Sequence, residues 1–262
     1  HVVCLGQNEL TPSGIKVSVF PNHLQIDLPS SISSARFKLI DIFGPDHYGY
    51  VPRLKAAFRA LNYDENMLEI IFLQQVNLYE NGERVKMSKR AGKIVTMDDL
   101  ISLVGKDAAR YFFIARKASA HLNFDLDLAL QKNNENPVYY CQYAHARICS
   151  ILRKARQENI YPNYFKNELI RKLVRPEELD LIKKMADFPE LLINIVDKRE
   201  PHLLANYTHE LCALFHHFYN HYRVINPKRI ELSQARLLLI ETVKHTLEIC
   251  LDLMGISAPE KM

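Results

Sequence analysis

Five basic side chains stand close together where the chain reads NLYENGERVKMSKRAGKIVTM. Arg84, Lys86, Lys89, Arg90 and Lys93 follow one another without an intervening acid, and Gly82 and Gly92 flank the first four. Lysine is a compact cation that can swing toward a polyanion, and flanking glycines let the backbone move. The run therefore indicates an anion-binding loop, although a solvated hairpin tip would have the same composition.

A second candidate site is the stretch GPDHYGY. It offers Asp46 and His47 directly after the apolar run FKLIDIF (37 to 43), and Gly44 would let a ligand approach the backbone closely. Ligands of parallel sheets bind beyond the carboxyl ends of the strands, so this position suits a binding site. An isolated histidine is more often structural or solvent-facing, and the residues alone leave both roles open.

Aromatic pairs form a third candidate. Tyr140 and Tyr143 lie three positions apart on an expected helix, so they share a face, and Phe215 and Tyr219 form a second pair. Such faces usually pack in a bundle core, but they also stack on unpaired RNA bases. Basic residues beyond the tyrosines are candidate phosphate contacts or ordinary solvated charges: Arg147, Arg153, Lys154 and Arg156.

Histidines near the second aromatic pair resemble a metal motif. His217 and His221 have the i, i+4 spacing, but no acid or cysteine accompanies them in the sequence. We therefore expect no metal site there and interpret the histidines as a polar helix face that faces RNA.

The elements that must position these residues follow two patterns. Within 36–130, strand 37–43, helix 51–62 and strand 67–79 predict βαβ units with a parallel sheet. Asn81-Gly82 predicts a hairpin between VNLYE and RVKM. Helices are expected at TMDDLISLVG, which has an N-cap threonine and a glycine stop, and at KDAARYFFIARKA, with no further strand after about residue 97.

Residues 131–262 show only helical patterns. These run over 137–158, 177–198, 200–224 and 231–254, with prolines near their starts, and predict an antiparallel helical bundle. The predicted fold class is therefore α/β followed by all-α, with a boundary near residue 130. Residues 1–35 carry no assignable function, although GIKVSVF-PN-HLQIDL has the form of a β-hairpin.

Composition sets outer limits on function. The 262 residues carry a formal charge of +4, so an anion site must be local, and five scattered cysteines without a CxxC pair are typical of reduced thiols in the cytoplasm. The sequence shows neither a signal peptide nor an apolar stretch long enough for a membrane span.

The motifs together resemble a known family. KMSKR matches four of the five positions of the KMSKS signature of class I aminoacyl-tRNA synthetases. GPDHYGYVPRLKAA, QQVNLYENGERVKMSKRAG, DAARYFF, HLNFDLDLA and NPVYYCQYAHARICSILRKA occur in the order and spacing of bacterial arginyl-tRNA synthetases. The resemblance covers residues 37–262, and the ending ISAPEKM is similar to the C-terminus of that family.

The resemblance implies a Rossmann-like catalytic portion followed by an anticodon-binding bundle of the DALR type. It implies ATP-dependent activation of L-arginine, with Mg²⁺, and transfer to the 3′ end of tRNA(Arg). Lys86 and Lys89 would hold the triphosphate, with Ser88 as a hydrogen-bonding companion and Met87 packing beside them. Gly44, Asp46 and His47 would contact nucleotide or arginine.

The same resemblance assigns Tyr140, Tyr143, Phe215, Tyr219 and Met262 to the anticodon site. Arg84, Arg90 and Lys93 receive no role that is favoured over solvation. The intact enzyme is expected to be a cytoplasmic monomer that binds no membrane.

One required part of the family pattern is missing. No HIGH-type motif occurs in the sequence, nor the upstream tyrosine and aspartate that hold the substrate guanidinium. We therefore expect the chain to begin midway through a catalytic domain and to be inactive alone. The alternative is a non-catalytic tRNA anticodon-binding module, in which the bundle functions and the half-domain is inert.

Overall fold

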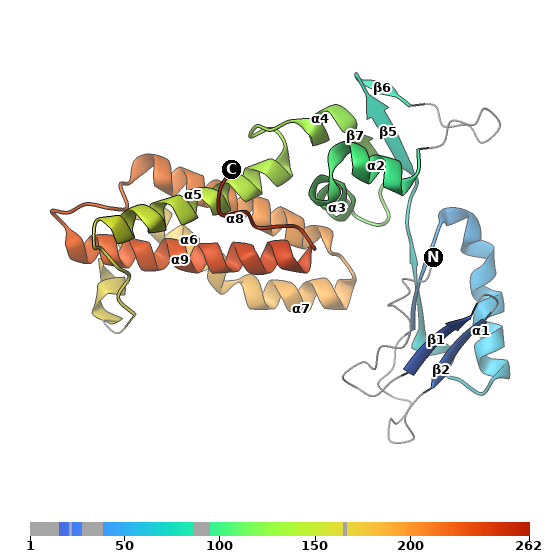
Figure 1. Ribbon diagram of the computed structural model, residues 1–262. Helices are drawn as coiled ribbons and strands as arrows, with labels where there is room; N and C mark the ends of the chain where they lie inside the picture. The colour runs from blue at the N-terminus through green and yellow to red at the C-terminus, as the bar shows by residue number, and fades with distance from the viewer. Residues whose placement is uncertain (1–15, 21–22, 28–38, 86–94, 165–166) are drawn as a thin grey trace. The chain divides into compact units, whose positions relative to one another are not determined.

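The computed structural model describes residues 16–20, 23–27, 39–85, 95–164 and 167–262 (Figure 1). The chain forms two compact units. The strand–helix unit lies within residues 1–75 together with 118–121, and the bundle unit comprises 76–117 and 122–262.

The strand–helix unit contains a β-hairpin and a βαβ element. Strands β1 (Lys16–Phe20) and β2 (His23–Asp27) pair antiparallel, as the sequence predicts. Strand β3 (Leu39–Phe43) and β4 (Leu68–Phe72) pair in parallel, with helix α1 (Val51–Ala60) between them in sequence. The predicted βαβ order is thereby confirmed.

The predicted single strand over 67–79 is wrong. Strand β4 ends at Phe72, and a separate strand, β5 (Val76–Glu80), begins after three residues in the bundle unit. The two strands belong to different sheets, so the chain passes from the first unit to the second within segment 67–79.

A small mixed sheet opens the bundle unit, in the order β6-β5-β7. Strand β6 (Glu83–Arg84) returns antiparallel on β5, and the turn residues Asn81 and Gly82 have φ of 52° and 75°. Both values are positive, as a type I′ turn requires, so the predicted hairpin is confirmed. Strand β7 (Leu122–Asp125) pairs in parallel with β5, which corrects the expectation of no strand after residue 97.

Short helices link this sheet to the bundle. Helix α2 (Met97–Val104) begins at the predicted N-cap Thr96, and the structure adds a capping box, in which the Thr96 hydroxyl accepts from the Asp99 N–H and the Asp99 carboxylate accepts from Thr96. The Thr96 hydrogen bonds lower the pKa of Asp99. Helices α3 (Lys106–Ile114) and α4 (Leu126–Leu130) follow.

Long helices build the bundle itself (Figure 1). They are α5 (Pro137–Gln157), α6 (Pro176–Ala186), α7 (Phe188–Lys198), α8 (His202–His221) and α9 (Ile230–Leu253), with a 3₁₀ helix at Asn167–Lys172. The predicted single helix over 177–198 is wrong, because the chain breaks at Asp187 and restarts with Pro189 in the first turn of α7.

Side-chain pairs give the directions of the helices. On α5 and α8, Tyr140 meets His216 and Arg147 meets Tyr219, so the two helices run the same way. Helix α9 runs opposite to α8, because Arg236, near its start, lies over Phe218, near the end of α8. Helices α5 and α8 therefore lie side by side and parallel to each other, whereas α8 and α9 are antiparallel.

A continuous apolar core holds the bundle unit together. Ile148 on α5, Phe215 on α8 and Ile240 on α9 are fully buried within it. Asn136 caps α5 by accepting from the Val138 N–H at 3.1 Å and donates to the Ala129 carbonyl at 3.0 Å, which fixes the entry into α5. Among the described residues, no helix combines the length and apolarity that a membrane span needs.

Candidate nucleic-acid interface

A pocket of 440 Å³ opens where α5, α8 and the C-terminal segment (residues 255–262) meet. Tyr143, Arg147, Tyr219 and Met262 line it, so three of the five residues predicted for the anticodon site share one pocket. Tyr143 and Arg147 both belong to α5, and they share one face of it because they are four residues apart. Tyr219 faces them because α8 runs alongside in the same direction.

Arg147 lies over two tyrosine rings in this pocket. Its guanidinium carbon is 4.8 Å from the centroid of the Tyr143 ring and 5.1 Å from that of Tyr219, and the guanidinium also donates to the Tyr143 hydroxyl. The ring faces attract the cation and hold its plane in place. Tyrosine rings and guanidinium planes are the groups on which proteins stack unpaired bases.

Tyr140 adjoins this pocket through His216. The His216 ring lies 4.8 Å from the Tyr140 ring and 5.9 Å from the Tyr143 ring, centroid to centroid. Burial, with a smaller effect of Arg147, lowers the pKa of His216 to about 4. Its Nε2 is buried and has no hydrogen-bond partner among the described residues, so the imidazole is neutral and packs as a ring. Burial also raises the pKa of Tyr140.

Phe215 occupies a different environment. Its side chain is fully buried, and its ring lies behind Tyr219 with 6.0 Å between the centroids. The structure therefore places Phe215 in the core, where it supports Tyr219 and has no exposed surface of its own.

A second pocket, of 510 Å³, shares Ile151 and Tyr219 with the first. Lys154, His221 and Arg223 line it, so its edge is basic. Cations beside an aromatic surface suit a ligand that carries both bases and phosphates.

The sequence-based reason for rejecting a metal at the histidines was incomplete. Glu177 of α6 does accompany them, because its Oε1 lies 3.9 Å from His217 Nε2, and the His217 and His221 rings are 4.4 Å apart. Within the described ranges, however, no three His, Cys, Asp or Glu side chains have an arrangement that could hold a metal ion.

The other candidate phosphate contacts divide into two kinds. Arg153 donates to the Glu260 carbonyl from both terminal nitrogens, at 3.2 and 3.3 Å, so it is engaged with the C-terminal segment. Lys154 is exposed, and its ion pair is long, with Nζ 4.0 Å from Glu158 Oε1. Arg156 is exposed as well, so both side chains are accessible to an anion.

The strand–helix unit contains the second predicted site. Gly44, Asp46 and His47 follow β3 directly, at the carboxyl end of a parallel strand as predicted. Asp46 and His47 are exposed and lie 3.3 Å apart, and a Cβ on Gly44 would meet the Asp46 carboxylate at 2.7 Å. Glycine at position 44 therefore leaves room for the Asp46 carboxylate at the strand end.

The predicted triphosphate residues Lys86, Met87, Ser88 and Lys89 lie outside the described residues, as do Arg90 and Lys93. The run begins, as predicted, at the end of the hairpin: Arg84 is exposed on β6 opposite Tyr79.

Sequence reasoning missed the central place of Arg147 and the part of His216. In the sequence Arg147 is one of several candidate cations, but its i, i+4 spacing from Tyr143 is a signal for a ring–cation pair on one helix face. His216 carried no comparable signal, because its contacts with Tyr140 and Tyr143 come from another helix.

Comparisons with known proteins agree with this geometry. The DALR anticodon binding domain family matches residues 141–262. Arginine–tRNA ligase 1 of Halalkalibacterium halodurans is 49% identical over 225 residues, and arginine–tRNA ligase of Bacillus subtilis is 50% identical over 226 residues. In both cases the alignment covers 86% of this chain and 40% of the relative, so the chain spans about two fifths of their length.

A solved structure shows the same fold at lower identity. Thermus thermophilus arginyl-tRNA synthetase superposes with a TM-score of 0.70 and 22% identity, covering 95% of this chain and 46% of that chain. The chain is thus similar to arginine–tRNA ligases over 86% of its length, residues 141–262 match the DALR anticodon binding domain family, and the fold is that of an arginyl-tRNA synthetase structure.

Proposed function

We propose that the chain is part of an arginine–tRNA ligase, in which residues 131–262 bind the anticodon loop of tRNA(Arg) and residues 36–130 belong to the catalytic domain. The observation that carries the proposal is the pocket of Tyr143, Arg147, Tyr219 and Met262. A cation held over two tyrosine rings presents flat faces for bases and a charge for the backbone.

Tyr140 and Phe215 take different parts in this proposal. Tyr140 forms the next ring along α5 and contacts RNA at the edge of the pocket, while Phe215 holds Tyr219 from behind. The exposed cations Lys154 and Arg223 of the adjoining pocket contact phosphates and position the loop without reading its sequence.

The reaction proposed for the whole protein is adenylation of L-arginine by ATP, followed by transfer of the arginyl group to the tRNA. Negative charge grows on the α-phosphate oxygens while the arginine carboxylate attacks, and fixed cations that stabilise this charge lower the activation barrier. The proposal gives this role to Lys86 and Lys89, with Ser88 and Met87 as their companions. Gly44, Asp46 and His47 contact nucleotide or arginine at the strand end.

Mg²⁺ is proposed as a companion of the ATP phosphates, since it is usually bound through substrate phosphates and few protein carboxylates. We assign it no ligand in this chain. The proposal further places the intact protein in the cytoplasm as a monomer that binds tRNA(Arg) and L-arginine.

A non-catalytic tRNA-binding module is the second candidate. It requires only the pocket of the bundle unit and none of the residues proposed for the reaction. The two candidates differ in whether the protein that contains this chain charges tRNA.

The experiment is an aminoacylation assay with the full-length protein and its Lys86→Ala, Lys89→Ala double variant. Arginine-dependent charging that collapses in the double variant supports the ligase, and undiminished charging refutes the loop assignment. A parent protein that binds tRNA(Arg) but charges none supports the module. Tyr140→Ala should weaken tRNA binding without changing the affinity for ATP.

A further inference from the structure

The C-terminal segment leaves α9 through a sharp turn that only glycine fits. Gly255 has φ of +67°, and a Cβ there would meet the Arg110 guanidinium at 2.5 Å. Arg110 in turn donates from Nε to the Met254 carbonyl at 2.6 Å. The turn directs the segment back across the bundle, toward α5.

Polar side chains along one face of α5 then hold the segment. Gln142 donates to the Ser257 carbonyl at 3.0 Å, His145 Nδ1 lies 2.9 Å from the Pro259 carbonyl, and Arg153 donates to the Glu260 carbonyl. Residues 142, 145 and 153 recur at helical spacing, so they share a face of α5. Backbone carbonyls of the segment are therefore bound at three points, and the Ser257 hydroxyl adds contacts with Gln142 and Asp107.

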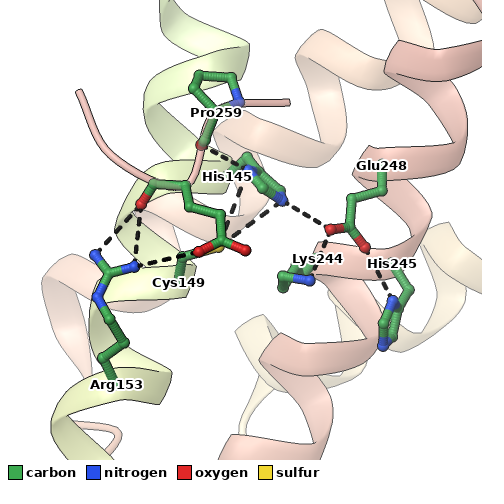
Figure 2. A network of polar contacts seen from close by, with 8 residues as sticks. His145, Cys149, Arg153, Lys244, His245, Glu248 and Pro259 are labelled. Carbon is green, nitrogen blue, oxygen red and sulfur yellow. Dashed lines mark hydrogen bonds and ion pairs between the residues drawn. The ribbon is translucent and has the colours of Figure 1, made fainter. Parts of the chain in front are cut away.

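His145 is the buried member of this set (Figure 2). The Pro259 carbonyl can only accept, so Nδ1 must donate to it. On the other side of the ring, Nε2 faces Glu248 Oε1 at 3.2 Å. The histidine therefore joins α5, α9 and the C-terminal segment at one point.

Glu248 is itself fixed by its neighbours on α9. Lys244 Nζ lies 2.7 Å from its Oε1 and His245 Nδ1 lies 3.0 Å from its Oε2 (Figure 2). Burial opposes ionisation of Glu248, but the hydrogen bonds from Lys244, His145 and His245 outweigh it and lower the pKa of the carboxyl. The carboxylate thus holds the imidazole in the orientation that aims Nδ1 at the segment.

The residue types in Figure 2 also resemble a nucleophilic site, and the geometry argues against it. Cys149 Sγ lies 3.8 Å from His145 Nε2, but burial raises the pKa of the thiol and both ring nitrogens have oxygen partners. A thiol is a poor nucleophile compared with a thiolate. Holding the segment is the role that remains for this network.

We propose that His145 is a positioning residue for the anticodon surface: by holding the Pro259 carbonyl, it places Met262 against Tyr143, Arg147 and Tyr219. The inference deepens the proposed function and rests on it for the RNA-binding part alone. His145 touches no RNA; it acts through residues 259–262, of which Lys261 and Met262 line the pocket.

Two substitutions separate the two contacts of the ring. His145→Asn retains an N–H donor near the Nδ1 position and so keeps the Pro259 contact, whereas His145→Gln retains a polar atom near the Nε2 position and keeps only the Glu248 contact. Because Met262 lines the same pocket as Tyr143 and Tyr219, we expect a ring-current shift of its methyl resonance, which reports the position of the segment by NMR. Met262→Leu assigns this resonance among the six methionines.

The expected result is that His145→Gln moves the Met262 resonance to its value in an unstructured peptide while His145→Asn leaves it shifted. Affinity for a tRNA(Arg) anticodon stem-loop should fall about tenfold in His145→Gln alone, as for the loss of one buried hydrogen bond. In a chain ending at residue 258, His145→Gln should cause no additional loss. A Met262 resonance that stays in place in His145→Gln, or an additional loss in the shortened chain, would overturn the proposal.

One measurement needs no variant, in case the substituted chains do not fold. Imidazole ¹⁵N spectra of the unaltered chain should show a protonated His145 Nδ1 whose hydrogen exchanges slowly, and an unprotonated Nδ1 would contradict the inference. A chain that binds no stem-loop, yet releases Met262 in His145→Gln, counts against the proposed function and supports the positioning role.

Discussion

Arg236 of α9 donates from Nε to Glu178 Oε1 of α6 at 2.7 Å, inside the bundle and away from solvent. The Glu178 side chain is 0% exposed and that of Arg236 is 9% exposed. Arg236 also donates to the Arg223 carbonyl at 2.9 Å and lies over the Tyr222 ring, while Glu178 accepts from the Arg175 N–H. The pair therefore joins α6 and α9 to the loop after α8, and Arg223 of that loop lines the pocket of 510 Å³.

Removing one partner of this pair should destabilise the bundle unit strongly. Arg236→Ala leaves a buried carboxylate without its cation, which costs about 3–5 kcal/mol in comparable cases. Urea unfolding monitored by circular dichroism measures the change in free energy. Lys183→Ala is the control, since its contact with Asp180 is 3.8 Å long and exposed, and should change stability by less than about 0.5 kcal/mol. Equal effects of the two substitutions would contradict a structural role for the buried pair.

The turn at Gly255 should not tolerate a side chain. Gly255→Ala forces a residue with a Cβ into φ of +67° and pushes the Cβ against Arg110. The backbone strain alone should lower the free energy of unfolding by about 1–3 kcal/mol, and the clash should lower it further. Gly82→Ala is the matched control, because Gly82 has φ of +75° but nothing within 4 Å of its Cβ position. The difference between the variants measures the Arg110 contact, and no difference would show that this contact is unimportant.

Acid should weaken the bundle through His216. The pKa of this side chain falls from 6.5 to about 4 on folding, because burial and Arg147 disfavour the imidazolium. Between these two values the unfolded chain binds more protons than the folded chain, so stability is complete above pH 6.5 and falls as the pH drops toward 4. Allowing for partial exposure, the loss is about 1–3 kcal/mol.

Denaturant unfolding at several pH values in this window measures that loss. His216→Gln cannot take up the proton and should show a correspondingly smaller dependence of stability on pH. If the substituted and unaltered chains lose stability equally as the pH falls, His216 does not titrate as the structure indicates.

Arg147 should contribute to RNA binding through its plane as well as its charge. Arg147→Lys keeps the charge but not the flat guanidinium that lies over Tyr143 and Tyr219, so we expect about a tenfold weaker complex with the tRNA(Arg) anticodon stem-loop. Arg156→Lys, at an exposed position on the same helix, is the control and should bind nearly as the unaltered chain does. Equal affinity of both variants would mean that charge alone is used.

Local signals in the sequence predicted much of the fold. Asn81-Gly82 specified the hairpin, and Thr96 with Asp99 specified the start of α2, because each depends on neighbouring residues only. Strand β7 was missed because it has four residues and is stabilised by pairing with β5, some 46 positions earlier. Pro189 broke the predicted helix at a position where proline is also compatible with a helix start.

The site was predictable only in part for the same reason. Tyr143 and Arg147 share a helix face, which spacing reveals, whereas their meeting with Tyr219 and Met262 depends on packing between distant segments. The anchoring of the C-terminal segment could not be read from the sequence at all, because Gln142 and His145 have the pattern of an ordinary polar stripe. Phe215 and Tyr219 look equivalent in sequence, but burial separates them.

The most direct test of the central claim is the affinity of the chain for the anticodon stem-loop of tRNA(Arg), measured by fluorescence anisotropy with Tyr219→Ala and with a stem-loop that lacks one anticodon base. We expect Tyr219→Ala to lose about 1–3 kcal/mol of binding free energy, as for one stacked base. With the stem-loop that lacks the base stacked on Tyr219, the same substitution should cost little binding free energy. Tyr161→Ala, at an exposed tyrosine outside the pocket, should bind as the unaltered chain does. Equal affinities for the Tyr219→Ala and unaltered chains would contradict the assignment of this surface to the anticodon.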